Sequence, residues 1–173
     1  MAADSTRRAV LAAAATLPLL AAGCNGVGAL AAPPRPAPDV ALLQTAITAE
    51  ELMVARYQAA ISSTPGSAAA GLAAELSTLL GEHHAHLAQL RSRLTVPAGS
   101  PYQPREGARR APVPKLPAAP QQLAAYLAAA ERQAAARLER QLLSAPPSLA
   151  QLLASISAAE ATHVPVLTAR QAG

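Results

Sequence analysis

Near the end of the sequence the chain reads Ala159-Glu160-Ala161-Thr162-His163, so that Glu160 and His163 are three residues apart. On a helix, side chains at this spacing project from the same face. Leucine and isoleucine residues on either side continue that face at steps of three and four, which is typical of a helix packed in a bundle. A carboxylate and an imidazole within such a face need a partner, because burying an unpaired polar group costs roughly 2–7 kcal/mol. A metal ion is one such partner.

The composition favours a core made only of helices. The 173-residue chain is long enough for one domain with a sizeable core, is 51% hydrophobic, and contains neither Phe nor Trp. Alanine and leucine dominate, and both are strong helix formers. The alternation of β-branched and aromatic residues that builds strands is nearly absent. We therefore predict an all-α fold.

The charge pattern argues against a nucleic-acid partner. The net charge is +4, but the basic residues are spread singly or in pairs and are not interleaved with aromatic residues. Nucleic-acid binding is therefore not expected. A weak attraction to anionic lipid headgroups fits this pattern better.

The first residues have the features of an export signal. Arg7 and Arg8 precede an apolar run from Ala9 to Ala22. This run is shorter than the roughly 20 residues that span a bilayer, and it is typical of a signal peptide. The arginine pair resembles a twin-arginine export signal, with ordinary Sec export as the alternative.

A single cysteine marks the end of this segment. Cys24 follows Leu20-Ala21-Ala22-Gly23 and resembles the acylated cysteine of a bacterial lipobox, with a plain signal peptide as the alternative. The resemblance implies a signal peptide over residues 1–23, a membrane-binding lipid on Cys24, and a location on the outer face of the cytoplasmic membrane. Residues 24–38 are rich in Pro and Ala and are predicted to form a tether.

Residues 39–170 are predicted to form four helices. We expect them over Asp39–Ser62, Ser67–Leu94, Gln121–Ser144 and Ser148–Arg170. Asp39 and Ser148 have side chains suited to N-caps. The connection over residues 95–120 contains seven prolines, and as polyproline it could extend to about 80 Å, against about 36 Å for a 24-residue helix. Short turns elsewhere then predict two helix hairpins joined by one long crossover, which is the ferritin-like arrangement.

One polar residue interrupts the apolar face near the middle of each predicted helix, and two of these residues are followed by a histidine three positions later. The midpoints of antiparallel helices meet at one level of a bundle, so we predict that six side chains converge. They are Glu50, His83, His86, Glu131, Glu160 and His163. Tyr57, two turns after the glutamate of the first helix, is predicted to be a core residue that borders this site.

The pattern resembles the ferritin-like di-metal carboxylate proteins, which place a Glu on each of two helices and Glu-x-x-His on the other two. More narrowly, residues 39–170 are similar to a ferritin-like domain of uncharacterised function in exported bacterial lipoproteins. The sequence segments that carry this similarity are Ala49-Glu50-Glu51-Leu52, Glu82-His83-His84-Ala85-His86-Leu87, Ala130-Glu131-Arg132 and Ala159-Glu160-Ala161-Thr162-His163. The resemblance implies that Glu50, Glu131, Glu160 and His163 are metal ligands, and that iron oxidation is the usual chemistry.

The second predicted helix departs from the family pattern, because His83 takes the place of the expected Glu. The remaining carboxylates, Glu50, Glu131 and Glu160, supply only three of the four negative charges that neutralise two divalent ions. A bridging hydroxide, Glu82 or Glu51 would supply the fourth, although Glu82 is rotated by about 100° from the apolar face. Alternatively, the site holds one ion. The candidate metals are iron, zinc, manganese and copper.

Three functions fit these features. The first is a membrane-anchored lipoprotein that binds one or two transition-metal ions in the bundle core, for redox chemistry or storage. The second is a non-catalytic helical scaffold of the cell envelope that has lost metal chemistry. An envelope pH sensor is a third, because clustered histidines titrate near neutrality. The sequence leaves open whether a reaction is catalysed, which proteins are partners, and whether the chain forms a homodimer.

Overall fold

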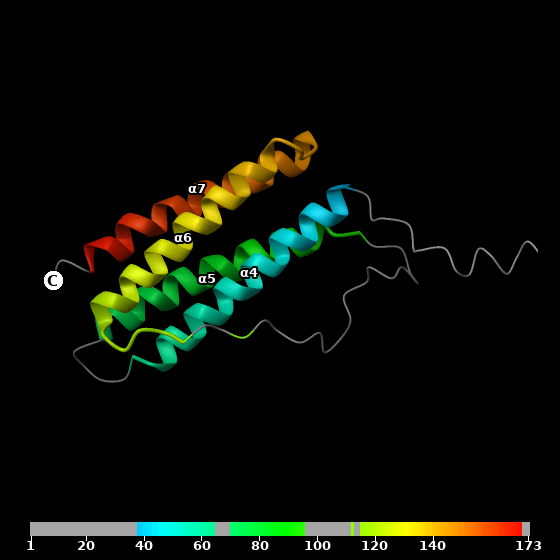
Figure 1. The fold of residues 1–173 in the computed structure, drawn as a ribbon. Helices are drawn as coiled ribbons and strands as arrows, with labels where there is room; N and C mark the ends of the chain where they lie inside the picture. The colour runs from blue at the N-terminus through cyan, green and yellow to red at the C-terminus, as the bar shows by residue number, and fades with distance from the viewer. Residues whose placement is uncertain (1–37, 65–69, 96–111, 113–114, 171–173) are drawn as a thin grey trace, which may run out of the picture. The chain divides into compact units, whose positions relative to one another are not determined.

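The computed structural model describes residues 38–64, 70–95, 112 and 115–170. The predicted signal peptide, with Arg7 and Arg8, lies outside the described residues, as do Cys24 and nearly all of the tether. The described residues contain four α-helices and no strand (Figure 1). The helices are α4 (Pro38–Ser62), α5 (Ala70–Arg93), α6 (Pro120–Leu142) and α7 (Pro147–Ala169). The all-α prediction is confirmed.

The helix boundaries differ from the predicted ones by a few residues. The predicted N-caps are wrong: Asp39 lies within the first turn of α4, and the N-cap of α7 is Pro146 instead of Ser148. Proline suits the first turn of a helix, because the N–H that it lacks has no intrahelical partner there. Helix α6 ends at Leu142, two residues before its predicted end at Ser144.

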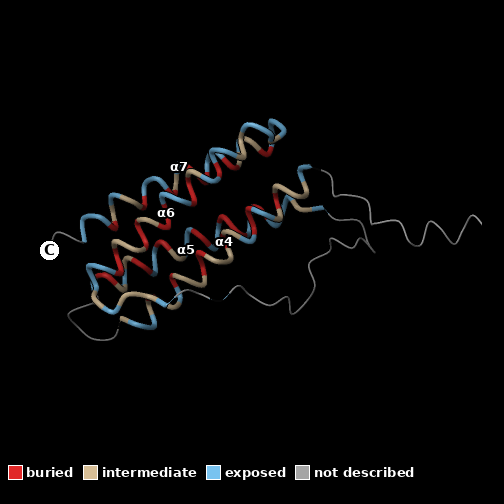
Figure 2. Tube along the Cα trace, viewed as in Figure 1, coloured by how far each residue is buried: buried red, intermediate tan, exposed pale blue. Residues whose placement is uncertain are grey.

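The four helices belong to one compact unit, Pro36–Gly173. Helix α4 packs mainly along α5, and α6 mainly along α7, with further contacts from α4 to α6 and from α5 to α7 (Figure 1). This arrangement is consistent with a four-helix bundle. Buried residues lie on the faces that the helices turn toward one another, and exposed residues lie outside (Figure 2).

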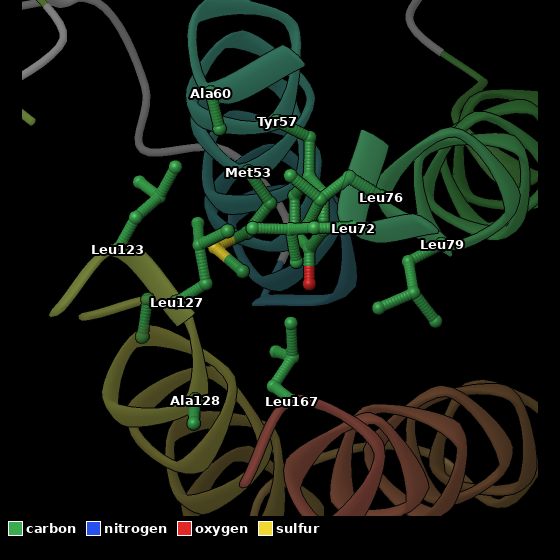
Figure 3. Close-up of a cluster of buried hydrophobic side chains, with 11 residues drawn as sticks. Met53, Tyr57, Ala60, Leu72, Leu76, Leu79, Leu123, Leu127, Ala128 and Leu167 are labelled. Carbon is green, nitrogen blue, oxygen red and sulfur yellow. The ribbon is translucent and has the colours of Figure 1, made fainter. Parts of the chain in front are cut away.

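Two apolar clusters form the core. The first apolar cluster, drawn in Figure 3, consists of Met53, Tyr57, Ala60, Leu72, Leu76, Leu79, Leu123, Leu127, Ala128, Ala130 and Leu167. The second apolar cluster consists of Leu43, Ala46, Ile47, Val54, Leu87, Leu90, Leu138, Leu149, Leu153 and Ile156. The starts of α5 and α6 meet in the first cluster and their ends in the second, so these two helices run in the same direction. Helices α4 and α7 run the opposite way.

Helix α7 is the one described helix that is long and apolar enough to cross a membrane by length and composition. The core helix of a soluble bundle passes the same test. Helix α7 contributes residues to both apolar clusters.

The first cluster predicts a cost for a truncated core side chain. Leu76 is fully buried, and Leu76→Ala leaves a cavity that should lower the free energy of unfolding by about 2–5 kcal/mol. Urea denaturation followed by circular dichroism measures this loss. Leu143 is 92% exposed, so the matched variant Leu143→Ala should change the value by less than about 0.5 kcal/mol. Equal losses in the two variants would contradict the assigned packing.

Candidate metal centre

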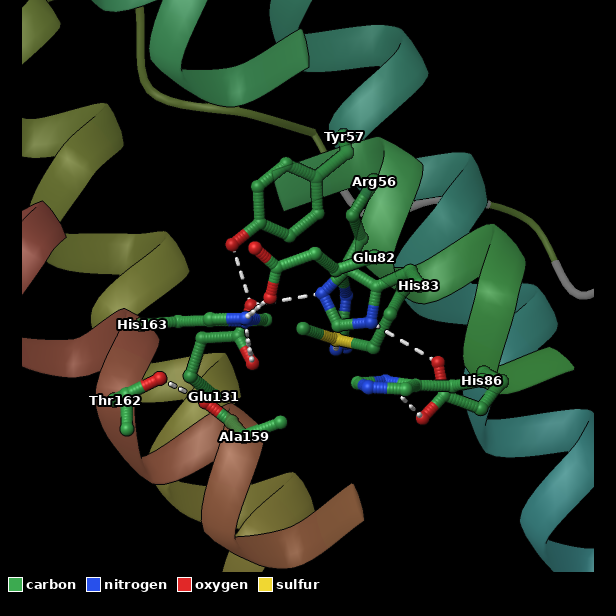
Figure 4. A network of polar contacts seen from close by, with 11 residues as sticks. Arg56, Tyr57, Glu82, His83, His86, Glu131, Ala159, Thr162 and His163 are labelled. Atoms are coloured by element: carbon green, nitrogen blue, oxygen red, sulfur yellow. Dashed lines mark hydrogen bonds and ion pairs between the residues drawn. The ribbon is translucent and has the colours of Figure 1, made fainter. Parts of the chain in front are cut away.

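The six predicted side chains are all buried in the interior of the bundle. Figure 4 shows four of them, His83, His86, Glu131 and His163, close together. Their exposed fractions run from 0% for His83 and Glu131 to 9% for His86. On α5, α6 and α7 these residues lie between those that join the first apolar cluster and those that join the second, and on α4 Glu50 lies between Ile47 of the second cluster and Met53 of the first. Leucine side chains therefore cover the centre from both ends, and each polar group must find its partner within the bundle.

His83 lies between two carboxylates from different helices. Its Nδ1 is 3.0 Å from Oε2 of Glu50 on α4, and its Nε2 is 3.0 Å from Oε1 of Glu131 on α6. A carboxylate can only accept a hydrogen bond, so both contacts are satisfied when both ring nitrogens carry a proton. The arrangement is that of an imidazolium held between two carboxylates.

The pKa values follow from these contacts. Burial alone would lower the pKa of His83, but its hydrogen bonds to Glu131 and Glu50 outweigh burial and raise the pKa to about 10. Burial alone would raise the pKa of Glu131, but its contacts with His163 and His83 lower it to about 2. The pKa of Glu50 is lowered in the same way, by His83 and His86. The centre therefore favours a charged His83 beside charged carboxylates.

Glu160 on α7 has the opposite environment. Burial and the charge of Glu50 raise its pKa well above the ordinary value. Oε2 of Glu160 has no hydrogen-bond partner among the described residues. Two neighbouring carboxylates ionise together only when a cation offsets their repulsion.

Glu82 contacts the centre through His163. Oε2 of Glu82 is 2.8 Å from Nε2 of His163, and the Glu82 side chain is 48% exposed. When His163 is neutral, the hydrogen that it donates to Glu82 leaves Nδ1 without a proton, 3.4 Å from Oε2 of Glu131. Carboxylates that hold the outer nitrogen of a histidine in this way orient the inner nitrogen toward a metal. Glu82 is therefore placed to position a ligand, although the sequence suggested it as a ligand itself.

Glu51, the other suggested source of a fourth carboxylate, does not reach the centre. Its Oε1 lies 2.7 Å from Nη2 of Arg91, in an ion pair whose side chains are 42% and 56% exposed. The sequence suggested Glu51 and Glu82 equally as further ligands, but in the structure Glu82 contacts the centre and Glu51 pairs with Arg91.

Tyr57 belongs to the centre more closely than the sequence indicated. Its hydroxyl donates a hydrogen bond to Oε1 of Glu131, and its ring centroid lies 4.9 Å from that of His83. Burial and the charge of Glu131 raise its pKa. The spacing of two helical turns from Glu50 was the available signal, but it did not reveal the hydrogen bond.

The described residues fit a metal ion on two grounds. Four buried ligand-type atoms lack hydrogen-bond partners within the described part of the chain: Nδ1 of His86, Oε2 of Glu131, Oε2 of Glu160 and Nδ1 of His163. Leaving such atoms unpaired costs free energy. Two groups also place one ligand atom from each residue within 4.8 Å of the others: Glu50, His83 and His86, and His83, Glu131 and His163.

Comparisons with protein-family models, with curated proteins and with solved structures find no match to the chain. The resemblance to ferritin-like domains therefore stays a prediction. The geometry of the buried histidines and carboxylates carries the functional argument.

The pKa of His83 predicts how the stability of the chelator-treated protein depends on pH. The folded value of about 10 exceeds the ordinary 6.5, so this stabilisation is complete below pH 6.5 and is lost as the pH rises toward 10. The urea midpoint, measured by circular dichroism, should therefore fall between about pH 7 and about pH 9.5. His83→Gln should reduce this fall, whereas His84→Gln, at an exposed position on the same helix, should keep it. A midpoint that does not fall over this range would show that His83 is not held as a cation.

Proposed function

We propose that this chain is a cell-envelope lipoprotein whose helical bundle binds one or two transition-metal ions at the centre. The observation that carries the proposal is the set of buried imidazole and carboxylate atoms without hydrogen-bond partners among the described residues. An ion would satisfy these atoms and offset the repulsion between Glu50 and Glu160. When bound, it would supply Lewis-acid or redox chemistry.

The ligand atoms are nitrogen and carboxylate oxygen from all four helices. Glu50, His83 and His86 would hold one ion, and His83, Glu131 and His163 a second. Glu160 lies against Glu50 and adds a further carboxylate. Mixed imidazole and carboxylate ligands suit iron, zinc, manganese and copper.

The helix directions support the ferritin-like topology as part of this proposal. Because α5 and α6 run the same way, the chain between Arg93 and Pro120 has to join opposite ends of the bundle. A long proline-rich crossover over residues 95–120 would do this. Most of that segment lies outside the described residues.

The envelope location rests on the sequence of residues 1–38. Arg7 and Arg8 would direct export, and a lipid on Cys24 would anchor the chain to the membrane as its partner. The Pro- and Ala-rich tether would hold the bundle away from the headgroups. The bundle would then work on the outer face of the cytoplasmic membrane, and the charge pattern gives no reason to expect nucleic acid as a partner.

Metal content tests the proposal directly. The chain, purified without chelator or loaded with iron(II), manganese, zinc or copper and then desalted, should retain about one or two ions per chain by elemental analysis. Glu131→Gln keeps the shape of the side chain but removes a charged ligand, so it should reduce the content at least about tenfold. The control His84→Gln should match the wild type. Less than about a tenth of an equivalent of every metal in the wild type would end the proposal.

The second candidate, a scaffold without metal chemistry, is favoured by the two hydrogen bonds with which His83 satisfies Glu50 and Glu131. On that reading His83 and the two carboxylates that it contacts stabilise one another without an ion. The two functions differ in what removal of the polar groups does to stability.

The double variant Glu160→Leu with His163→Leu separates the two functions. Replacing buried polar groups with apolar ones should stabilise a scaffold by about 1–4 kcal/mol, seen as a higher melting temperature in chelator. Added metal should raise the melting temperature of the wild type alone if the centre binds ions. A double variant that is more stable in chelator, together with a wild type that does not respond to any metal, would favour the scaffold.

A further inference from the structure

The two nitrogens of His83 serve different halves of the centre. Nδ1 lies 3.0 Å from Oε2 of Glu50, whose Oε1 is 3.7 Å from Nδ1 of His86. Nε2 lies 3.0 Å from Oε1 of Glu131, whose Oε2 is 3.4 Å from Nδ1 of His163. His83 is the one residue common to the two ligand groups found among the described residues.

The two halves are chemically matched. Each contains one nitrogen of His83, one carboxylate and one further histidine. The rings of His86 and His163 are nearly parallel, at 11°, and each lies edge-on to the ring of His83, at 89° and 80°. The same ring therefore presents one nitrogen to each of two similar ligand pairs.

We propose that His83 bridges two metal ions as an imidazolate. Nδ1 binds the ion shared with Glu50 and His86, and Nε2 binds the ion shared with Glu131 and His163. This inference rests on the proposed metal-binding function and adds the number of ions and the bridging group. His83 exchanges its two ring protons for the two ions, and the protons leave to solvent, so no electrons move in the step.

The charge balance supports the bridge. Once Glu160 ionises beside the ions, the buried carboxylates of Glu50, Glu131 and Glu160 supply three negative charges, one fewer than two divalent ions require. An imidazolate at His83 supplies the fourth, so the sum is −4 against +4. Burying an unbalanced charge is costly, so this match favours two ions joined by the ring over two ions with a neutral His83.

Each ring nitrogen of His83 already faces a carboxylate, so each nitrogen can hold either a proton or a metal ion beside that carboxylate. In the imidazolium form each nitrogen carries a proton that faces a carboxylate, Glu50 on one side and Glu131 on the other. Replacement of each proton by a metal ion keeps the same pairs of groups in contact. The bridge therefore needs no change in which helices face one another.

Copper(II) is the probe, because it binds nitrogen and oxygen sites most strongly among the divalent first-row metals and each ion carries one unpaired electron. The full chain is titrated with copper(II), and bound copper is compared with the integrated paramagnetic resonance signal. We expect two ions per chain and a signal per copper that falls as the second equivalent binds, because an imidazolate couples the two spins. The control His84→Gln should behave in the same way.

Half-site variants complete the test. His86→Ala and His163→Ala should each retain one ion with an undiminished signal per copper, because only one half of the centre is lost. Circular dichroism checks that both remain helical, and the wild-type titration decides the question if either unfolds. No bound copper in the wild type would overturn the metal-binding function itself. One ion, or two ions with undiminished signal, would overturn the bridge alone.

Discussion

The structure depends on one electrostatic constraint, which is the burial of carboxylates and imidazoles between two apolar clusters. Removal of charged groups from water is costly unless each one finds a partner of opposite charge or a hydrogen bond. The protein meets this constraint by bringing acids from α4, α6 and α7 against histidines from α5 and α7. Each helix thus supplies both apolar packing and part of a charge balance.

The balance is incomplete within the described residues. His83 is satisfied on both sides, and Tyr57 adds a hydrogen bond to Glu131. Ligand-type atoms of His86, Glu160 and His163 are buried without such a partner. These unpartnered atoms are the ones that the proposed ion would satisfy.

The surroundings of the centre differ between its two sides. Glu82 reaches the outer nitrogen of His163 from a half-exposed position and so links the buried centre to solvent. Such a contact fixes the side of the ring that faces inward, and its carboxylate lies where protons can exchange with water. The second apolar cluster, by contrast, closes the side of the centre near the start of α7 with leucine and isoleucine side chains.

The sequence by itself determined the four helices, their buried faces and the six polar residues within them, because helical periodicity is a local property of the chain. Tertiary structure decided what those side chains touch. Glu51 and Glu82 both lie beside a predicted ligand in sequence, yet one pairs with Arg91 at the surface and the other with His163. The hydrogen bond from Tyr57 to Glu131, and the two contacts of His83, join residues from different helices. Such contacts depend on the rotation of each helix against its neighbours, and only packing of the whole bundle fixes that rotation.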